Sequence, residues 1–271
     1  MRGSTIARRL AAGVLIALGL ILLLAPAIAP HSYSAQFREA PNAPPSRAFP
    51  LGTDALGRDR WSRTLYGGRI SLLCAPAAAL FSALLALAIG LLAGMCQGPI
   101  ERLAAAAADL CLSLPWLFAL LAARAVLPLD APPAATIAIT FGMLGLLGWA
   151  GPARMILAAA RRNLGSDFAL LARASGCRPW RIAAIHLVPN LLPLAFAQFL
   201  VTVPSFLLAE ANLDLLGLGI PEPVPSWGGQ LRELENLSCI PSHPWILAPA
   251  LLLFTVVTCF HLLVSADEYR V

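Results

Sequence analysis

The chain has 271 residues, of which 59% are hydrophobic and only 12% are charged, with a formal net charge of +5. Soluble domains carry about a quarter charged residues, so this composition excludes an ordinary soluble globular domain. All 19 basic residues are arginine. Without lysine, the chain cannot contain a nucleotide-binding loop of the G-x-x-x-x-G-K-[ST] type.

Six apolar runs approach the length of about 20 residues that a bilayer-crossing helix needs. In chain order they are Leu10–Ala29, Ile70–Met95, Leu103–Val126, Ala134–Ala150, Leu187–Ala211 and Trp245–Val264. Helices are expected throughout, because lipid offers unpaired backbone groups no hydrogen-bond partner. We therefore predict an all-α integral membrane protein with six transmembrane helices. The alternative, a soluble protein with a large buried core, does not readily hold six runs of this length.

The first run has an alternative interpretation as a cleaved signal peptide. Three arginines precede it, and Ala27–Ala29 resembles a small-residue cleavage site. However, the apolar part of a signal peptide has roughly 7–15 residues, and this run is longer. We predict a retained transmembrane helix within residues 1–30, an extracytoplasmic or interfacial segment over residues 31–69, and a transmembrane domain over residues 70–271.

The arginines predict the orientation of the chain. Those before the first run place the N-terminus in the cytoplasm, and six spans return the C-terminus to the same side. The segment Gly151–His186 then lies inside and carries six arginines against a single acid, Asp167. Residues 31–69 also carry six arginines and disagree with the rule. Placing them inside would move the more basic segment outside, so we keep this topology.

The basic segment 151–186 has its own helix signals. Phe168–Ala174 predicts a short helix that ends at Gly176, a residue suited to the left-handed position after a helix. Ser166 is placed to cap this helix. Pro179 fits the first turn of a second short helix, and Pro189 marks the start of the fifth span. We expect two short helices at a sharp bend, and the alternative is an ordinary basic loop.

Three sequence blocks carry a family resemblance. The first is Ala172-x-x-x-Gly176, followed by Arg181-Ile182 and His186-Leu187-x-Pro189-Asn190. It resembles the cytoplasmic coupling motif of binding-protein-dependent ABC importer permeases, and most closely the C-type subunit of the dipeptide/oligopeptide/nickel group. The other two blocks are Leu51–Asp59 with Tyr66–Leu72, and Glu210–Ala211 with Leu216–Gly219 and Pro225–Gly228.

This resemblance implies an ABC importer permease fold in the bacterial inner membrane. The chain would form half of a translocation pathway for di- or oligopeptides. Nickel or another small solute is the alternative cargo, and an ATPase-independent carrier is a less favoured alternative function. The implied partners are a B-type permease subunit, two ATP-binding subunits, an extracytoplasmic substrate-binding protein and membrane lipid, but no nucleic acid. ATP would bind the partner subunits, so the chain is not expected to be an enzyme or to hold a catalytic, cofactor or metal site.

The resemblance also assigns residues to roles. Those expected to couple the chain to the ATPase are Phe168, Leu171, Ala172, Arg173, Gly176, Arg181, His186, Pro189 and Asn190. The acidic residue that is frequent in the family's motif is missing, because Leu170 stands in its place. Glu210 and Asp214 are candidates for the translocation pathway or its outer mouth, since ionisable residues in a span are functional candidates. Trp227, in a proline-rich outer loop, is a third candidate. The alternative is that these carboxylates are interfacial caps.

Overall fold

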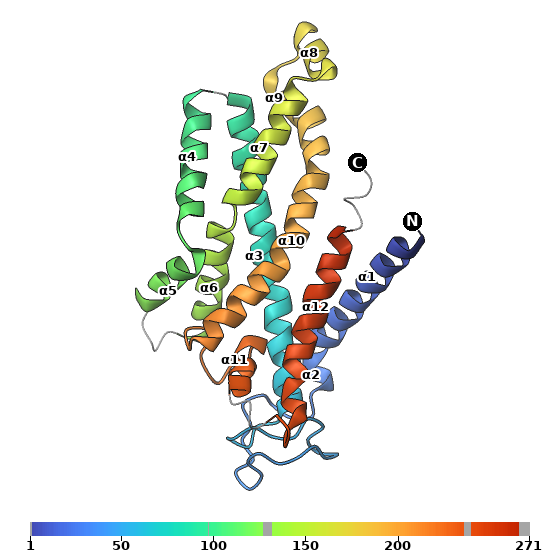
Figure 1. Ribbon diagram of the computed structural model, residues 1–271, viewed down its shortest axis with the longest axis vertical. Coiled ribbons are helices and arrows are strands. Elements are labelled where there is room, and N and C mark those ends of the chain that lie inside the picture. Colours follow the sequence, from blue (N-terminus) through green and yellow to red (C-terminus); the bar gives the residue numbers. More distant parts are fainter. Residues whose placement is uncertain (1, 97, 127–131, 236–239, 266–271) are drawn as a thin grey trace. The chain divides into compact units, whose positions relative to one another are not determined.

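The structure is a computed structural model that describes residues 2–96, 98–126, 132–235 and 240–265 (Figure 1). Over these residues the regular secondary structure is helical, apart from one isolated β-bridge between Thr53 and Asp59, and residues 29–59 form turns and irregular loops. Five helical runs in this part of the chain are long and apolar enough to cross a membrane: Thr5–Leu23, Arg60–Cys96, Pro133–Leu164, Pro179–Leu215 and Pro244–Val264. The all-α membrane fold is therefore confirmed. The expected count of six spans is not, and the C-terminal residues 266–271 lie outside the described part.

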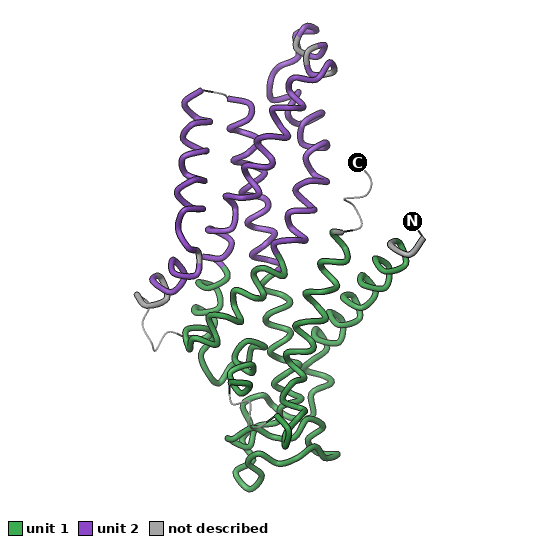
Figure 2. The backbone as a smooth tube through the Cα atoms, in the orientation of Figure 1, with its two compact units in different colours: residues 1–75, 123–141, 203–271 green, residues 76–122, 142–202 purple. Residues whose placement is uncertain are grey.

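The chain divides into two compact units (Figure 2). The first comprises residues 1–75, 123–141 and 203–271, and the second comprises residues 76–122 and 142–202. The helical elements are α1 (Arg2–Leu23), α2 (Ala25–Ile28), α3 (Arg60–Cys96), α4 (Pro99–Ser113), α5 (Trp116–Val126), α6 (Pro133–Leu147), α7 (Ala150–Leu164), α8 (Asp167–Ala174), α9 (Pro179–Ile182), η1 (Ala183–Leu187), α10 (Val188–Leu215), α11 (Trp227–Leu231), η2 (Arg232–Glu235), η4 (Pro244–Leu247) and α12 (Ala248–Ser265).

The expected third span, Leu103–Val126, is interrupted in the structure. Helix α4 ends at Ser113, Leu114 is extended with ψ 126°, and α5 begins after Pro115. A proline disfavours helical geometry in the residue before it, which explains the break. The two resulting helices have 15 and 11 residues, so each is shorter than the roughly 20 residues of a complete span.

Helix α7 occupies residues that the sequence analysis assigned to the basic segment. Only Gly148 and Trp149 separate it from α6, and the two helices together form the candidate span Pro133–Leu164. Arginines interrupt the apolar pattern of α7 in the sequence, but two of them form ion pairs with α4 in the structure. The helical run therefore continues well past the predicted end at Ala150. Similarly, α3 begins at Arg60, ten residues before the predicted start of the second span.

The core of the second unit is built mainly from alanine. Ala153, Ala160 and Ile156 of α7 are buried there. Gly90 and Gly94 of α3 face them, and a Cβ atom on Gly90 would lie 2.8 Å from the carbonyl oxygen of Ala153. A Gly-x-x-x-Gly spacing of this kind lets membrane helices approach each other closely. Small residues therefore set the α3–α7 contact.

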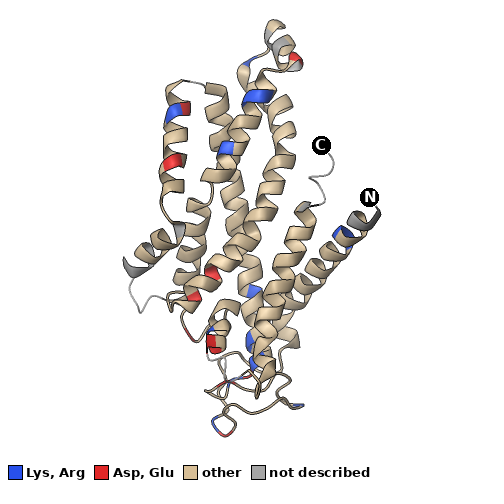
Figure 3. Ribbon diagram, in the orientation of Figure 1, with Lys and Arg blue, Asp and Glu red and all other residues tan. Residues whose placement is uncertain are grey.

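In the first unit, α1 packs against α12 and leaves a broad apolar face uncovered. Ile6, Leu10 and Leu20 of α1 are all more than half exposed, and Phe254 of α12 is 70% exposed. Helix α12 and the part of α10 from Val188 to Ala209 carry no Asp, Glu, Lys or Arg (Figure 3). Exposed apolar surface of this extent is typical of a membrane protein.

Candidate functional site

The predicted bend after α8 is present in the second unit. Gly176 has φ +74°, and the N–H of Cys177 donates to the carbonyl oxygen of Ala172 at 3.0 Å. This hydrogen bond is the one that defines a glycine-terminated helix of the Schellman type. Ser166, which was expected to cap α8, donates its hydroxyl to the carbonyl oxygen of Asn163 at 2.5 Å.

The second short helix, α9, begins as predicted with Pro179 in its first turn. Arg178 is extended, and its carbonyl oxygen accepts from the N–H groups of Arg181 and Ile182 at 2.9 and 3.2 Å. Ile182 is 2% exposed and anchors α9 to the unit, whereas Trp180 is 63% exposed. A cavity of about 410 Å³ lies at the bend and is lined by Ser175, Gly176, Cys177, Arg178, Trp180 and Arg181.

A wide helical turn, η1, joins α9 to α10. The N–H of Val188 donates to the carbonyl oxygen of Ala183, five residues earlier, which makes this a π-helical turn. Pro189 has no N–H to offer and follows directly, and a proline ring tends to disrupt α-helical hydrogen bonding in the preceding turn. His186 is half-buried in this turn, and Pro189 and Asn190 are exposed at the start of α10. The helical run thus continues from Pro179 rather than starting at Pro189.

We call residues 167–187 the coupling segment. Its exposed side chains include apolar and cationic ones: Leu171 is 67% exposed and Ile185 is 53% exposed, and the exposed Arg178 and Arg181 line the same cavity as Trp180. Asp167 and Ser175 are exposed as well. Ala172 is partly exposed. The side chains of Phe168 and Arg173, both predicted coupling residues, lie outside the described part of the structure.

The predicted pathway residues come together in the first unit, but they are buried. Glu210, Asp214 and Trp227 are 1%, 3% and 1% exposed. Asp214 accepts a hydrogen bond from the N–H of Ile220 at 2.6 Å and another from the hydroxyl of Ser226. Its carboxylate therefore holds the loop that connects α10 to α11.

Trp227 and Glu210 tie this loop and α10 to the beginning of α3. The indole Nε1 of Trp227 donates to the carbonyl oxygen of Thr64 at 3.0 Å, and the hydroxyl of Ser71 donates to Glu210 at 3.4 Å. Gly68 makes the close approach possible, since a Cβ atom there would lie 2.5 Å from the Trp227 ring. These contacts give Trp227 and Glu210 a structural role. Their role in the translocation pathway stays a prediction.

Sequence reasoning missed Glu222, which binds two arginines. Its carboxylate accepts from Arg58 Nη1 at 2.6 Å and from Arg63 Nη2 at 2.9 Å, while Asp54 accepts from Arg58 Nε at 2.6 Å. Burial alone would lower the pKa of Arg58, but its hydrogen bonds to Asp54 and Glu222 outweigh this effect and raise the pKa above the ordinary value. The sequence did contain a signal for this ion-pair cluster, because closely spaced arginines in an ordered segment need acidic partners.

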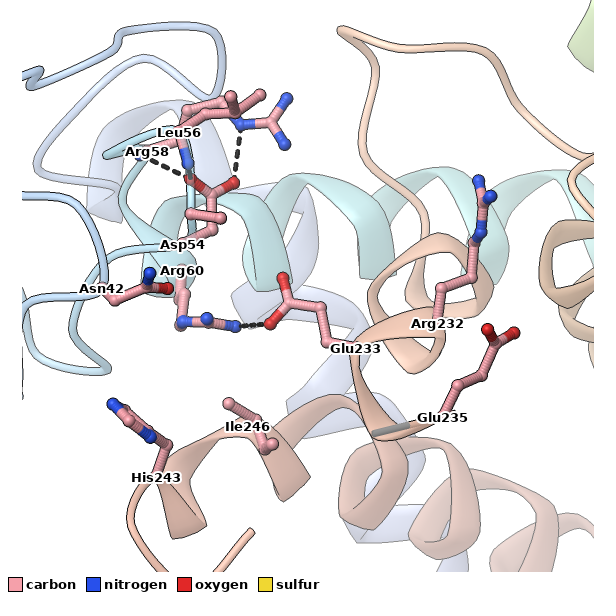
Figure 4. Close-up of a pocket in the computed structure, with 11 residues that line it drawn as sticks. Asn42, Asp54, Leu56, Arg58, Arg60, Arg232, Glu233, Glu235, His243 and Ile246 are labelled. Carbon is pink, nitrogen blue, oxygen red and sulfur yellow. Dashed lines mark hydrogen bonds and ion pairs between the residues drawn. The ribbon is translucent and has the colours of Figure 1, made fainter. Parts of the chain in front are cut away.

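A cavity of about 510 Å³ lies next to this arginine cluster (Figure 4). Its lining residues are Asn42, Asp54, Ala55, Leu56, Arg58, Arg60, Arg232, Glu233, Glu235, His243 and Ile246. Arg60 forms an ion pair with Glu233, so part of the charge in the cavity is already neutralised. Within the residues that the structure describes, no group of three or more His, Cys, Asp or Glu side chains is placed to hold a metal ion.

A comparison with protein families matches residues 86–270 to the binding-protein-dependent transport system inner membrane component. The chain is also similar to individual permeases. It is 32% identical to the dipeptide transport system permease protein DppC of Bacillus subtilis, over 92% of this chain and 76% of the relative. It is 30% identical to the oligopeptide transport system permease protein OppC of the same organism, over 95% of this chain and 81% of the relative. A di/tripeptide transport system permease protein of Pseudomonas aeruginosa is 32% identical over 79% of this chain and 71% of the relative.

Proposed function

Because the chain belongs to the family of binding-protein-dependent transport system inner membrane components, we propose that it is the C-type permease subunit of a peptide ABC importer. The names of its relatives support peptides as the cargo, since they are permeases of dipeptide, di/tripeptide and oligopeptide transport systems. In this proposal the chain forms half of the translocation pathway and a B-type permease subunit forms the other half. A substrate-binding protein delivers the peptide from outside the cell.

The coupling segment is the observation that carries this proposal. It presents Leu171 and Trp180 on its surface, and Arg178 and Arg181 line the same cavity as Trp180. Such a surface is suited to a cleft on an ATP-binding subunit that offers apolar contacts and carboxylates. Each guanidinium can form charge-assisted hydrogen bonds with a carboxylate, and these are stronger than neutral ones. Docking in this chain then does not need the acidic residue that is frequent in the family's motif.

The helical run explains how movement of the segment reaches the membrane. Residues Pro179–Leu215 form one continuous helical run, so α9 and α10 are joined without an intervening loop. In the proposal, two ATP-binding subunits bind ATP, close against each other, and move the coupling segments of the two permeases. The ATP-bound state then favours one of two arrangements of the helices, and transport follows from alternating between them.

The substitution Gly176→Val tests the coupling role. Gly176 has φ +74° and no atom within 4 Å of an added Cβ, so the substitution strains the backbone without a steric clash. A residue with a side chain loses about 1–2 kcal/mol in the left-handed conformation, so the bend is expected to open. We expect membrane insertion to be retained and ATP-dependent peptide uptake to fall, measured in proteoliposomes that contain all the partner subunits and the binding protein.

Gly98→Val is the control for backbone strain outside the coupling segment. Gly98 has φ +70° and likewise has nothing within 4 Å of an added Cβ, but it lies before α4, outside the coupling segment. We expect this variant to keep its uptake. Wild-type uptake by Gly176→Val would refute the role of the bend. Absence of ATP-dependent peptide uptake by the complete wild-type assembly would refute the proposed function itself.

A further inference from the structure

Two ion pairs join α4 to α7 within the second unit. Arg161 pairs with Glu101, and Arg154 pairs with Asp109. The residue numbers increase along α4 as they decrease along α7, so the two helices run antiparallel. The pairs are about two helical turns apart on each helix.

The two pairs differ in their depth along the helices. Glu101 and Arg161 lie near one end of α4 and α7, and each has a further arginine next to it in the sequence. Such a charged end marks the water boundary of a membrane helix. Asp109 and Arg154 lie eight and seven residues further in, which at 1.5 Å per residue is about 10–12 Å. Because the hydrocarbon core is about 30 Å thick, the second pair lies at hydrocarbon depth.

This deep pair is nevertheless exposed on the surface of the chain. The side chain of Asp109 is 60% exposed and that of Arg154 is 47% exposed. A charge in contact with lipid is costly within the hydrocarbon core, with a cost that reaches at least about 2.5–3.5 kcal/mol at the bilayer centre, and charges within the core usually face a protein interior or a water-filled cavity. A dry contact with another subunit would also have to offset the desolvation of both groups. A water-filled surface avoids both costs.

Helix α4 has a separate face that suits lipid. Leu103 and Leu110 are 73% and 65% exposed, and they lie seven residues apart on one side of the helix. This side is turned by about 100° from Asp109, since each residue of an α-helix rotates by that angle. The exposed surface of α4 therefore has an apolar face beside Asp109, and Leu112, which is 51% exposed, lies about 60° from Asp109 on its other side.

We propose that the face formed by Asp109 and Arg154 lines the aqueous route of the cargo, and that the pair is a site for the two oppositely charged ends of a zwitterionic peptide. This inference rests on the proposed function. The carboxylate of Asp109 accepts from the peptide ammonium, and the guanidinium of Arg154 donates to the peptide carboxylate, for which it has a matching bidentate geometry. Both side chains exchange one charged partner for another, so neither is left unpaired.

Thiol labelling tests the position of this face. Ala158 is exposed on α7, one turn from Arg154. The substitution Ala158→Cys is introduced into a chain whose native cysteines are replaced, and this chain is assembled with all its partners in vesicles. The probe is a membrane-impermeant thiol reagent. We expect it to modify Ala158→Cys and not Leu110→Cys, which reports on the apolar face. Failure to modify Ala158→Cys while peptide uptake is intact overturns this inference and leaves the proposed function standing.

Peptide protection tests the ligand. An unblocked dipeptide is expected to slow the labelling of Ala158→Cys, whereas the same dipeptide with an acetylated N-terminus and an amidated C-terminus is not. Asp109→Asn removes one charged partner and is expected to weaken protection about tenfold or more, because a hydrogen bond to a charged group contributes about 1.5–3 kcal/mol. Glu101→Gln, in the shallow pair, is the matched control and keeps the protection. Equal protection by both dipeptides, or none by either, overturns the binding site.

Discussion

The substitution Gly90→Ala is expected to push α3 and α7 apart. An added Cβ atom would lie 2.8 Å from the carbonyl oxygen of Ala153 and 2.9 Å from the Cβ of Ile156. Carbon atoms in good contact are about 3.5–4.0 Å apart, so the helices would have to separate by roughly 0.5–1 Å. Ile156 is fully buried, and the carbonyl oxygen belongs to the backbone, so neither can move aside as a flexible side chain would.

The size of the effect follows from two opposing terms. A gap of 0.5–1 Å forfeits about a quarter to a half of each affected van der Waals contact, and overpacking of this kind typically costs about 1–3 kcal/mol. Against this, alanine is favoured over glycine in a helix by about 1 kcal/mol. The net change for Gly90→Ala alone is therefore expected to be about 0–2 kcal/mol of destabilisation.

Gly142→Ala isolates the packing term. Gly142 lies in α6 and has nothing within 4 Å of an added Cβ, so this variant gains the helix preference without a clash. The free energy of unfolding should then differ between the two variants by the packing cost of about 1–3 kcal/mol. Gly90→Ala should have the lower thermal unfolding midpoint in detergent. Equal midpoints would refute the argument that Gly90 sets the α3–α7 distance. Gly94→Ala, whose Cβ would lie 2.9 Å from that of Ala160, should behave like Gly90→Ala.

Three further substitutions probe the first unit, each by thermal unfolding. Trp227→Phe removes the hydrogen bond to Thr64 and is expected to cost about 0.5–1.5 kcal/mol; an unchanged midpoint would contradict a role for the indole N–H. Glu222→Gln weakens the contacts with two arginines and should lower the thermal unfolding midpoint. Glu235→Gln, on the exposed rim of the cavity, should leave the midpoint unchanged. Equal effects of the two substitutions would show that the arginine cluster contributes nothing to stability. Asp214→Asn keeps one acceptor but cannot accept on its amide nitrogen, so the loop after α10 should become more susceptible to proteolysis, and unchanged cleavage would argue against this anchor.

Local rules predicted the membrane fold and the bend of the coupling segment well. Gly176 and Pro179 restrict the backbone by themselves, and the helix end and helix start expected from them are present. Long apolar runs likewise define most membrane helices, because lipid excludes other backbone conformations. These features depend on residues close together in the sequence, so one sequence is enough to find them.

The errors in the helix boundaries have a physical cause that lies further along the chain. Arg154 and Arg161 ended the predicted fourth span because each is unfavourable in an apolar run, but each has an acid on α4 as its partner. Pro115 was overlooked inside the third run, although it separates α4 from α5. The pattern of apolar residues along one helix gives no information about ion pairs with another helix.

The candidate site was predicted unevenly for the same reason. The exposed surface of the coupling segment follows from its own short motif. The burial of Glu210 and Asp214 depends instead on how α10 and the loop after it pack: Ser71, the partner of Glu210, lies 139 residues earlier, and Ser226, the partner of Asp214, lies beyond the end of the helix. Glu222 was missed because its two arginines lie more than 150 residues earlier in the chain.

The π-helical turn at Ala183–Leu187 fixes the direction in which the coupling segment faces. A π turn holds about one residue more than an α turn, and each α-helical residue rotates the chain by about 100°. Rewinding this turn into α-helical geometry with all its residues kept would swing Trp180 by about that angle around the axis of α10, whereas removing one residue would leave its direction nearly unchanged. The π geometry of this turn therefore sets the angle between the part of the chain proposed to meet the ATP-binding subunit and the helix that follows it.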